Sequence, residues 1–147
     1  MTASGIDSRK GQNLVEFSVV VLLAVIMLLF VVEMGRIVEV SVTVANAARA
    51  GVRYAIVHGS TRSVGSAIND ASGPGANPAQ VLTVVSNFAG AGLLTTSLLV
   101  INVTYPSASN APGQAVNITV VYPYNPLTTY FPNTLRLGSA AQGIIVY

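Results

Sequence analysis

The stretch that decides the fold of this chain is residues 11–57, GQNLVEFSVVVLLAVIMLLFVVEMGRIVEVSVTVANAARAGVRYAIV. Its first part, from Leu14 to Val32, has no proline or glycine, and Glu16 is its only charged residue. An α-helix needs about 20 consecutive apolar residues to cross the hydrocarbon core of a bilayer. The stretch therefore predicts a transmembrane segment at about residues 14–32.

The helical pattern continues beyond the apolar run, and we expect one long helix over residues 12–58. At about 1.5 Å per residue, such a helix is longer than a bilayer is thick, so its second half must pack elsewhere. There the apolar residues recur at three- and four-residue steps, and most are small enough to allow close approach of another backbone. This small-residue stripe consists of Val40, Val44, Ala47, Ala48, Gly51, Tyr54 and Ala55.

Basic residues before the apolar run predict the orientation of the chain. Arg9 and Lys10 place the N-terminal end, residues 1–11, in the cytoplasm as a short leader, and residues 59–147 become an exported domain. A cleaved secretory signal would have a shorter apolar region followed by a small-residue cleavage site. Here the run passes directly into further helix, so we expect the segment to stay in the mature protein.

The sequence after the long helix predicts a small α+β domain. Short helices are expected at 64–71 and 78–92, the second with Asn77 as N-cap and one apolar side. Alternating apolar residues then predict three antiparallel strands, at 98–105, 116–124 and 135–147. We expect irregularities in the third strand at Gly138 and Gly143, and the small-residue stripe as the cover of the sheet. The apolar side of the 78–92 helix consists of Val81, Leu82, Val85 and Phe88.

Composition restricts the chemistry. The 147 residues allow one modest domain and an anchor, and the absence of cysteine excludes disulfides and thiolate metal sites. Seven basic residues spread along the chain form no cluster for nucleic acid. His58 is the only histidine and is expected to end the long helix, and Asp70 is the only acidic residue after Glu39. We therefore expect no enzyme activity, no cofactor and no nucleic-acid partner.

Two segments, Asn102-Val-Thr104 and Asn117-Ile-Thr119, fit the N-glycosylation pattern. Both lie in predicted strands, where asparagine and threonine at alternate positions are ordinary solvent-facing residues. We interpret them as the polar face of the sheet.

Glu16 raises the most specific question, because a charged carboxylate inside lipid costs about 2.5–3.5 kcal/mol. One interpretation places it at the headgroup boundary, where most of that cost disappears. The other supposes a cut after Gly11, which makes Gln12 the first residue and gives it a charged α-amine. The Glu16 carboxylate of a neighbouring subunit would pair with that amine and fix the axial register of the helices.

Glu33, Arg36 and Glu39 follow at three-residue steps, which predicts a charge ladder on the helix where it leaves the membrane.

The spacing from Gly11 to Glu16, before an apolar helix, resembles the type IV prepilin motif. Together with VEMGR at 32–36 and NAARAGVRYA at 46–55, it resembles the TadE-like family of tight-adherence pilus assembly proteins. The resemblance implies a cleavage junction for prepilin peptidase at Gly11 and Gln12, and an assembly role for Glu16 beside Phe17. It also implies a membrane-exit motif of Glu33, Gly35 and Arg36, and a second helical motif of Arg49, Gly51, Arg53 and Tyr54.

The expected function is a pilin-like subunit that is inserted as a single-pass protein of the cytoplasmic membrane, processed, and then built into or used to assemble a surface filament. Its implied partners are copies of itself or other pilins, prepilin peptidase, the inner-membrane assembly platform and the lipid bilayer. Two alternatives stay open: an uncleaved, membrane-anchored exported scaffold, and a membrane-tethered enzyme or ligand-binding protein. The last would need a polar cleft formed by residues such as His58, Asp70 and Arg136.

Overall fold

The computed structural model describes residues 8–60, 77–127 and 134–146. The chain divides into two compact units, Met1–Arg36 and Ile37–Tyr147, with the division inside the first helix. Each unit is described by itself below.

The first helix, α1, runs from Ser8 to Val57. It begins before the predicted residue 12 and ends one residue before the predicted residue 58. In the first unit, every residue from Gly11 to Val32 is exposed except Ile26, which is half-buried. An 18-residue window of this helix has a mean hydropathy of 3.0. A helix that is apolar and exposed on all sides fits a single-pass membrane protein.

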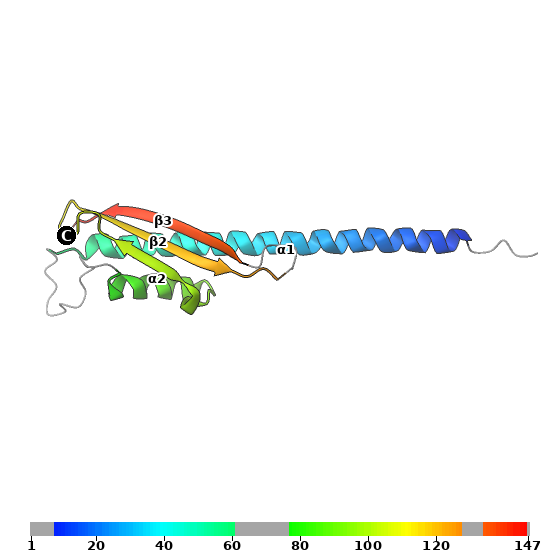
Figure 1. Ribbon diagram of the computed structural model, residues 1–147, viewed down its shortest axis with the longest axis horizontal. Helices are drawn as coiled ribbons and strands as arrows, with labels where there is room; N and C mark the ends of the chain where they lie inside the picture. The colour runs from blue at the N-terminus through cyan, green and yellow to red at the C-terminus, as the bar shows by residue number, and fades with distance from the viewer. Residues whose placement is uncertain (1–7, 61–76, 128–133, 147) are drawn as a thin grey trace, which may run out of the picture. The chain divides into compact units, whose positions relative to one another are not determined.

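The second unit contains the predicted antiparallel sheet. Its strands are β1 (Val100–Thr104), β2 (Ala115–Tyr124) and β3 (Leu135–Ile144), in the order β1-β2-β3 (Figure 1). The alternation predicted from the sequence is confirmed, because one face of β1 and β2 is buried and the other is more exposed. The buried residues of the two strands are Val103, Val116, Ile118, Val120 and Tyr124.

The predicted small-residue stripe of α1 is the cover of this sheet. Val44, Ala47, Ala48 and Ala55 are each at most 1% exposed and belong to one apolar core with the buried strand residues. Val40 and Tyr54 pack against this core from its edge. The α+β fold expected from the sequence is thus confirmed, with helix and sheet held together by small side chains.

A second helix, α2 (Ala79–Ala91), completes the core through Val81, Val85 and Ala89, which are fully buried. The predicted apolar side was wrong at one position, because Phe88 is 44% exposed. A short 3-10 helix, η2 (Thr96–Leu98), follows α2 and was not predicted. The helix predicted at 64–71 lies outside the described residues.

Asn77 does not cap α2 as predicted, because its side chain bonds to a strand instead. The N-cap residue is Pro78, which offers no side-chain cap. Asn77 has φ 52°, and its Oδ1 accepts a hydrogen bond of 2.7 Å from the backbone N–H of Val103. The Asn77 N–H donates in turn to the Val103 carbonyl at 3.3 Å. Asparagine tolerates this left-handed conformation, and it satisfies both backbone groups of Val103.

The irregularities predicted at the glycines of β3 were wrong, because β3 pairs with β2 without interruption from Leu135 to Ile144. Gly143 has a packing reason instead. A Cβ at this position would lie 2.5 Å from Val52 Cγ1 and 2.7 Å from Ile56 Cγ2 of α1. The helix lies so close to the strand here that only glycine fits.

Hydrogen bonds fix the C-terminal end of α1 to the rest of the second unit. The Val146 N–H donates to the Ile56 carbonyl at 2.8 Å, and the Ser60 N–H donates to the Asn110 carbonyl at 3.0 Å. The last carbonyl groups of a helix receive no hydrogen bond from within it. The bond from Val146 therefore satisfies the Ile56 carbonyl, which would otherwise lack a donor. The small-residue stripe is therefore held on the sheet at its end as well as along its length.

Candidate functional site

The predicted cleavage junction lies close to the beginning of α1. Since the helix begins at Ser8, the Gly11–Gln12 bond lies near its first turn. Gly11 is exposed, and no atom lies within 4 Å of a Cβ built there. The first N–H groups of a helix have no acceptor inside it, and glycine weakens a helix, so this segment opens at low cost.

Glu16 and Phe17 are both exposed on α1, Phe17 to 69%. The Glu16 side chain makes no hydrogen bond or ion pair within the described part of the chain. Ser18, two residues on, differs because its Oγ donates to the Val15 carbonyl at 2.7 Å. The serine is satisfied by its own helix, whereas the carboxylate has no partner among the described residues.

The residues of the predicted membrane-exit motif differ in exposure. Glu33 is 1% exposed and Arg36 is half-buried, while Gly35 is exposed. Glu39 is exposed and forms no ion pair with any described residue, so the predicted three-member charge ladder is not complete. The burial of Glu33 could not be read from the local sequence, where it occupies the same kind of position as Glu39.

The second helical motif has one side in the core and one in solvent. A Cβ at Gly51 would lie 2.5 Å from Val85 Cγ2 and 3.0 Å from Ile118 Cδ1, so this glycine allows α1 to approach both α2 and β2. Tyr54 is half-buried beside it. Arg49 and Arg53, at the intervening positions, are exposed on the opposite side of the helix.

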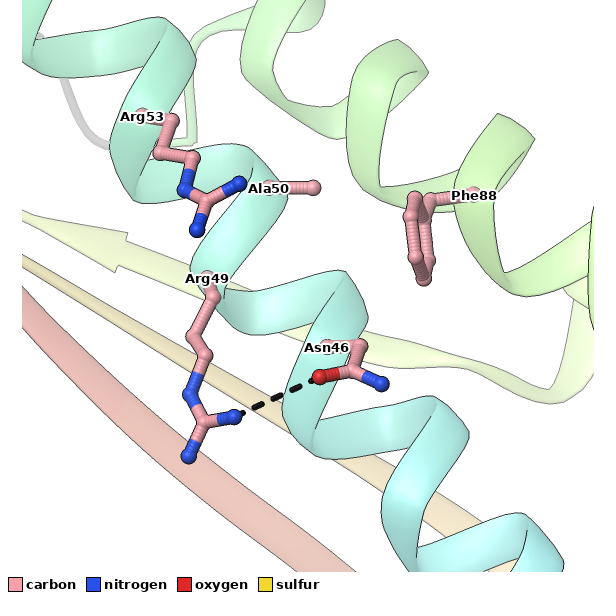
Figure 2. Close-up of a pocket in the computed structure, with 5 residues that line it drawn as sticks. All are labelled: Asn46, Arg49, Ala50, Arg53 and Phe88. Atoms are coloured by element: carbon pink, nitrogen blue, oxygen red, sulfur yellow. Dashed lines mark hydrogen bonds between the residues drawn. The ribbon is translucent and has the colours of Figure 1, made fainter.

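These arginines line a surface pocket of about 290 Å³ between α1 and α2 (Figure 2). Its lining residues are Asn46, Arg49, Ala50, Arg53 and Phe88. Arg49 donates from Nη1 to Asn46 Oδ1 at 3.3 Å, while the Phe88 ring lies across from α1 on α2. The sequence did not predict this pocket, because Phe88 was placed with Val81 and Val85 on the apolar side of the 78–92 helix.

His58 directly follows the last residue of α1, Val57, and so lies one residue beyond the helix that was expected to include it. Its Nδ1 lies 2.7 Å from the Tyr54 carbonyl, and its ring stacks on the Tyr54 ring with centroids 3.8 Å apart. Because a carbonyl can only accept, Nδ1 carries the hydrogen. Within residues 8–60, 77–127 and 134–146, no three His, Cys, Asp or Glu side chains are grouped to hold a metal ion.

The hypothetical cleft of His58, Asp70 and Arg136 is only partly described. His58 is half-buried at the end of α1, and Arg136 is exposed on β3. Asp70 lies outside the described residues.

The two glycosylation-like segments pair with each other across the sheet. Asn102 lies opposite Thr119, and Thr104 lies opposite Asn117. The Oδ1 atom of Asn117 is buried. Asn102 and Thr104 are exposed, whereas Asn117 and Thr119 are half-buried, so the expected solvent-facing surface is open on β1 and partly covered on β2.

The family model described as TadE-like protein matches residues 11–53. The match extends from the predicted junction through Glu16 and the membrane-exit motif to Arg53, and ends one residue before Tyr54. Neither a curated protein nor a solved structure matches the chain. The resemblance predicted from the sequence is confirmed for residues 11–53, which are similar to the TadE-like protein family.

Proposed function

We propose that this chain is a pilin-like subunit of a pilus related to the tight-adherence type, cleaved between Gly11 and Gln12 by prepilin peptidase and incorporated in the filament or used to assemble it. One observation carries the proposal. The TadE-like region begins with a helical segment, from Gly11 to Val32, whose apolar side chains are exposed on all sides, with Glu16 as the single charge from Leu14 to Val32. The role is mechanical and includes no catalytic step.

The Glu16 carboxylate has a defined task in this proposal. Cleavage gives Gln12 a charged α-amine four residues before Glu16, about 6 Å along the helix axis. When helices pack side by side in an apolar bundle, a carboxylate that meets the amine of a neighbour offsets the cost of its own desolvation. Since van der Waals contacts between apolar helices allow many registers, this pair selects one of them.

The remaining parts of the proposal follow from charge and hydropathy. Arg9 and Lys10 hold the leader in the cytoplasm, where the peptidase and the assembly platform act on the chain. The second unit then lies outside the cytoplasmic membrane. Copies of the chain or other pilins are its partners in the filament, and the bilayer holds α1 before assembly.

The mature N-terminus tests processing directly. We expect N-terminal sequencing and intact mass of chain from sheared filaments to give Gln12 as the first residue. In cells that lack the peptidase, the chain should keep its leader and stay in the membrane fraction. Met1 or Thr2 as the first residue in filament material would contradict the proposal.

An uncleaved membrane-anchored scaffold is the second candidate. The observation that favours it is that α1 is already helical from Ser8, so the junction must unwind before a peptidase can bind it as an extended chain. A chain of full length that remains in the membrane and is absent from filaments would establish the scaffold.

A further inference from the structure

The outward side of α1 in the second unit carries an acidic patch with apolar neighbours. Val38 is 60% exposed and Val42 is 54% exposed, and the exposed Glu39 lies between them in sequence. Val42 follows Val38 by four residues and Glu39 by three, so its side chain adjoins both of theirs on the helix surface. We call it the Glu39 patch.

The same side of α1 carries the surface pocket, about one to four helical turns beyond the Glu39 patch toward the C-terminus. We call it the arginine pocket. It offers two exposed guanidinium groups, Arg49 and Arg53, and an aromatic ring, Phe88, that is 44% exposed (Figure 2). Arg49 is oriented by its bond to Asn46 Oδ1. Arg53 makes no hydrogen bond or ion pair with a described residue. The pocket therefore suits a partner that combines a carboxylate with small apolar groups.

The Glu39 patch has that composition. Among the described residues of the second unit, Glu39 is the only acidic one, and the basic ones are Arg49, Arg53 and Arg136. Within one copy, Glu39 lies 10 residues from Arg49 and 14 residues from Arg53, about 15 and 21 Å along the helix. These groups are too far apart to pair within one chain, so an ion pair of Glu39 with either arginine would join two copies.

We propose that the Glu39 patch of one copy binds the arginine pocket of a second copy. The inference rests on the proposed function, because it describes how subunits of a filament would meet. In the contact, the Glu39 carboxylate lies between Arg49 and Arg53 of its neighbour, while Val38 and Val42 cover the Phe88 ring. Ion pairs at an exposed surface are individually weak, so the burial of the valines and the aromatic ring must supply much of the association.

The contact is head-to-tail. The Glu39 patch and the arginine pocket are different surfaces, so each copy presents its patch to one neighbour and its pocket to another. Such contacts can repeat from copy to copy without closing on themselves. Two neighbouring helices are then displaced along their axes by about 15–21 Å. A two-fold contact, in which each copy serves the other, would instead close after two copies.

Cysteine cross-linking tests the geometry, because the chain contains no cysteine of its own. The variant with both Glu39→Cys and Arg53→Cys should give a ladder of dimers, trimers and larger products with a short bis-maleimide in whole membranes and in sheared filaments, because paired glutamate and arginine side chains hold their Cα atoms farther apart than a disulfide allows. Within one chain the two positions are about 21 Å apart along the helix, too far for this reagent to join them. Glu39→Cys combined with Arg136→Cys, which also replaces an exposed arginine, is the matched control and should give no ladder. Products that stop at dimers, or an equal ladder in the control, would overturn the inference.

Charge reversal tests the chemistry. Glu39→Arg, and separately the pair Arg49→Glu and Arg53→Glu, should each lower the amount of chain in sheared filaments by about fivefold or more. The chain that carries all three changes should recover, which a failure of folding would not allow, and Arg136→Glu should have no effect. Normal incorporation of the reversed chains would overturn the inference and leave the proposed function intact. An unchanged chain that keeps its leader and is absent from filaments would instead contradict the proposed function, while the cross-links in membranes still decide the inference.

Discussion

Gly51 of α1 lies against Val85 of α2 so closely that a Cβ at position 51 would lie 2.5 Å from Val85 Cγ2. Ile118 Cδ1 of β2 would lie 3.0 Å from the same Cβ. Three elements of the second unit therefore meet at one glycine. The depth at which α1 lies on the sheet is set by the absence of a side chain at this position.

Gly51→Ala should destabilise the chain by about 1–3 kcal/mol, because overpacking of a core outweighs the better helix propensity of alanine. Urea unfolding of the full chain in detergent, followed by a probe of the second unit, measures the change. Adding Val85→Ala should recover part of the loss, since it removes the methyl groups that the new Cβ meets.

Gly35→Ala is the matched control on the same helix, because no atom lies within 4 Å of a Cβ at Gly35. It should be neutral or stabilising by up to about 1 kcal/mol. Equal losses in the two variants would show that helix glycines matter here for another reason than packing.

Gly143→Ala should also destabilise, by about 1–3 kcal/mol, because its Cβ would meet Val52 and Ile56 of α1. Gly138→Ala in the same strand should cost less, since the nearest atom, Val121 Cγ2, would be 3.3 Å away at the end of a side chain. Thermal unfolding of the two variants side by side gives the comparison. A larger loss at Gly138 would contradict the close approach of α1 to β3.

Asn77→Ala should lower stability by about 2–3 kcal/mol, because it leaves the buried Val103 N–H without its acceptor and places a side chain at positive φ. Asn77→Gly tolerates the backbone but lacks the acceptor and should lose about 1–2 kcal/mol. Asn77→Asp keeps an acceptor and should lose least. Hydrogen exchange at the Val103 amide should quicken in the same order, and an unchanged rate in Asn77→Ala would refute this role for the side chain.

Glu16→Ala should leave membrane insertion intact and reduce incorporation into filaments about tenfold, a loss equivalent to about 1.4 kcal/mol in association. Ser18→Ala, which removes a hydroxyl bonded only to its own helix turn, is the control and should assemble normally. Quantitative blotting of membrane and sheared fractions separates the two steps. If Glu16→Ala assembled as well as the unchanged chain, the register role of the carboxylate would be lost.

Most of the second unit could be predicted because its signals are local and periodic. The alternation around Val103 and Ile118 fixed the buried face of the strands, and the small residues at Ala47, Ala48 and Ala55 marked the side of α1 that lies on them. Both patterns are set by the geometry of a single element, so no knowledge of distant residues was needed.

The failures all depended on contacts between distant parts of the chain. Asn77 next to a proline has the sequence of an N-cap, yet β1 uses its side chain, and Gly143 serves a helix that is far away in sequence. Phe88 fits the apolar side of α2 by spacing, but Ala89 occupies the buried position. The arginine pocket was missed for the same reason, since it requires α1 and α2 to be placed side by side.

The bond between Asn77 and Val103 has a further consequence for the filament assembly proposed above. β1 lies at the edge of the sheet, where free backbone groups invite strand pairing with any neighbouring molecule. By occupying both backbone groups of Val103, Asn77 shortens the edge that is open to such pairing. In the proposed filament, where identical domains would lie close to one another, incorrect pairing between the β1 strands of neighbouring copies would have fewer free backbone groups to use.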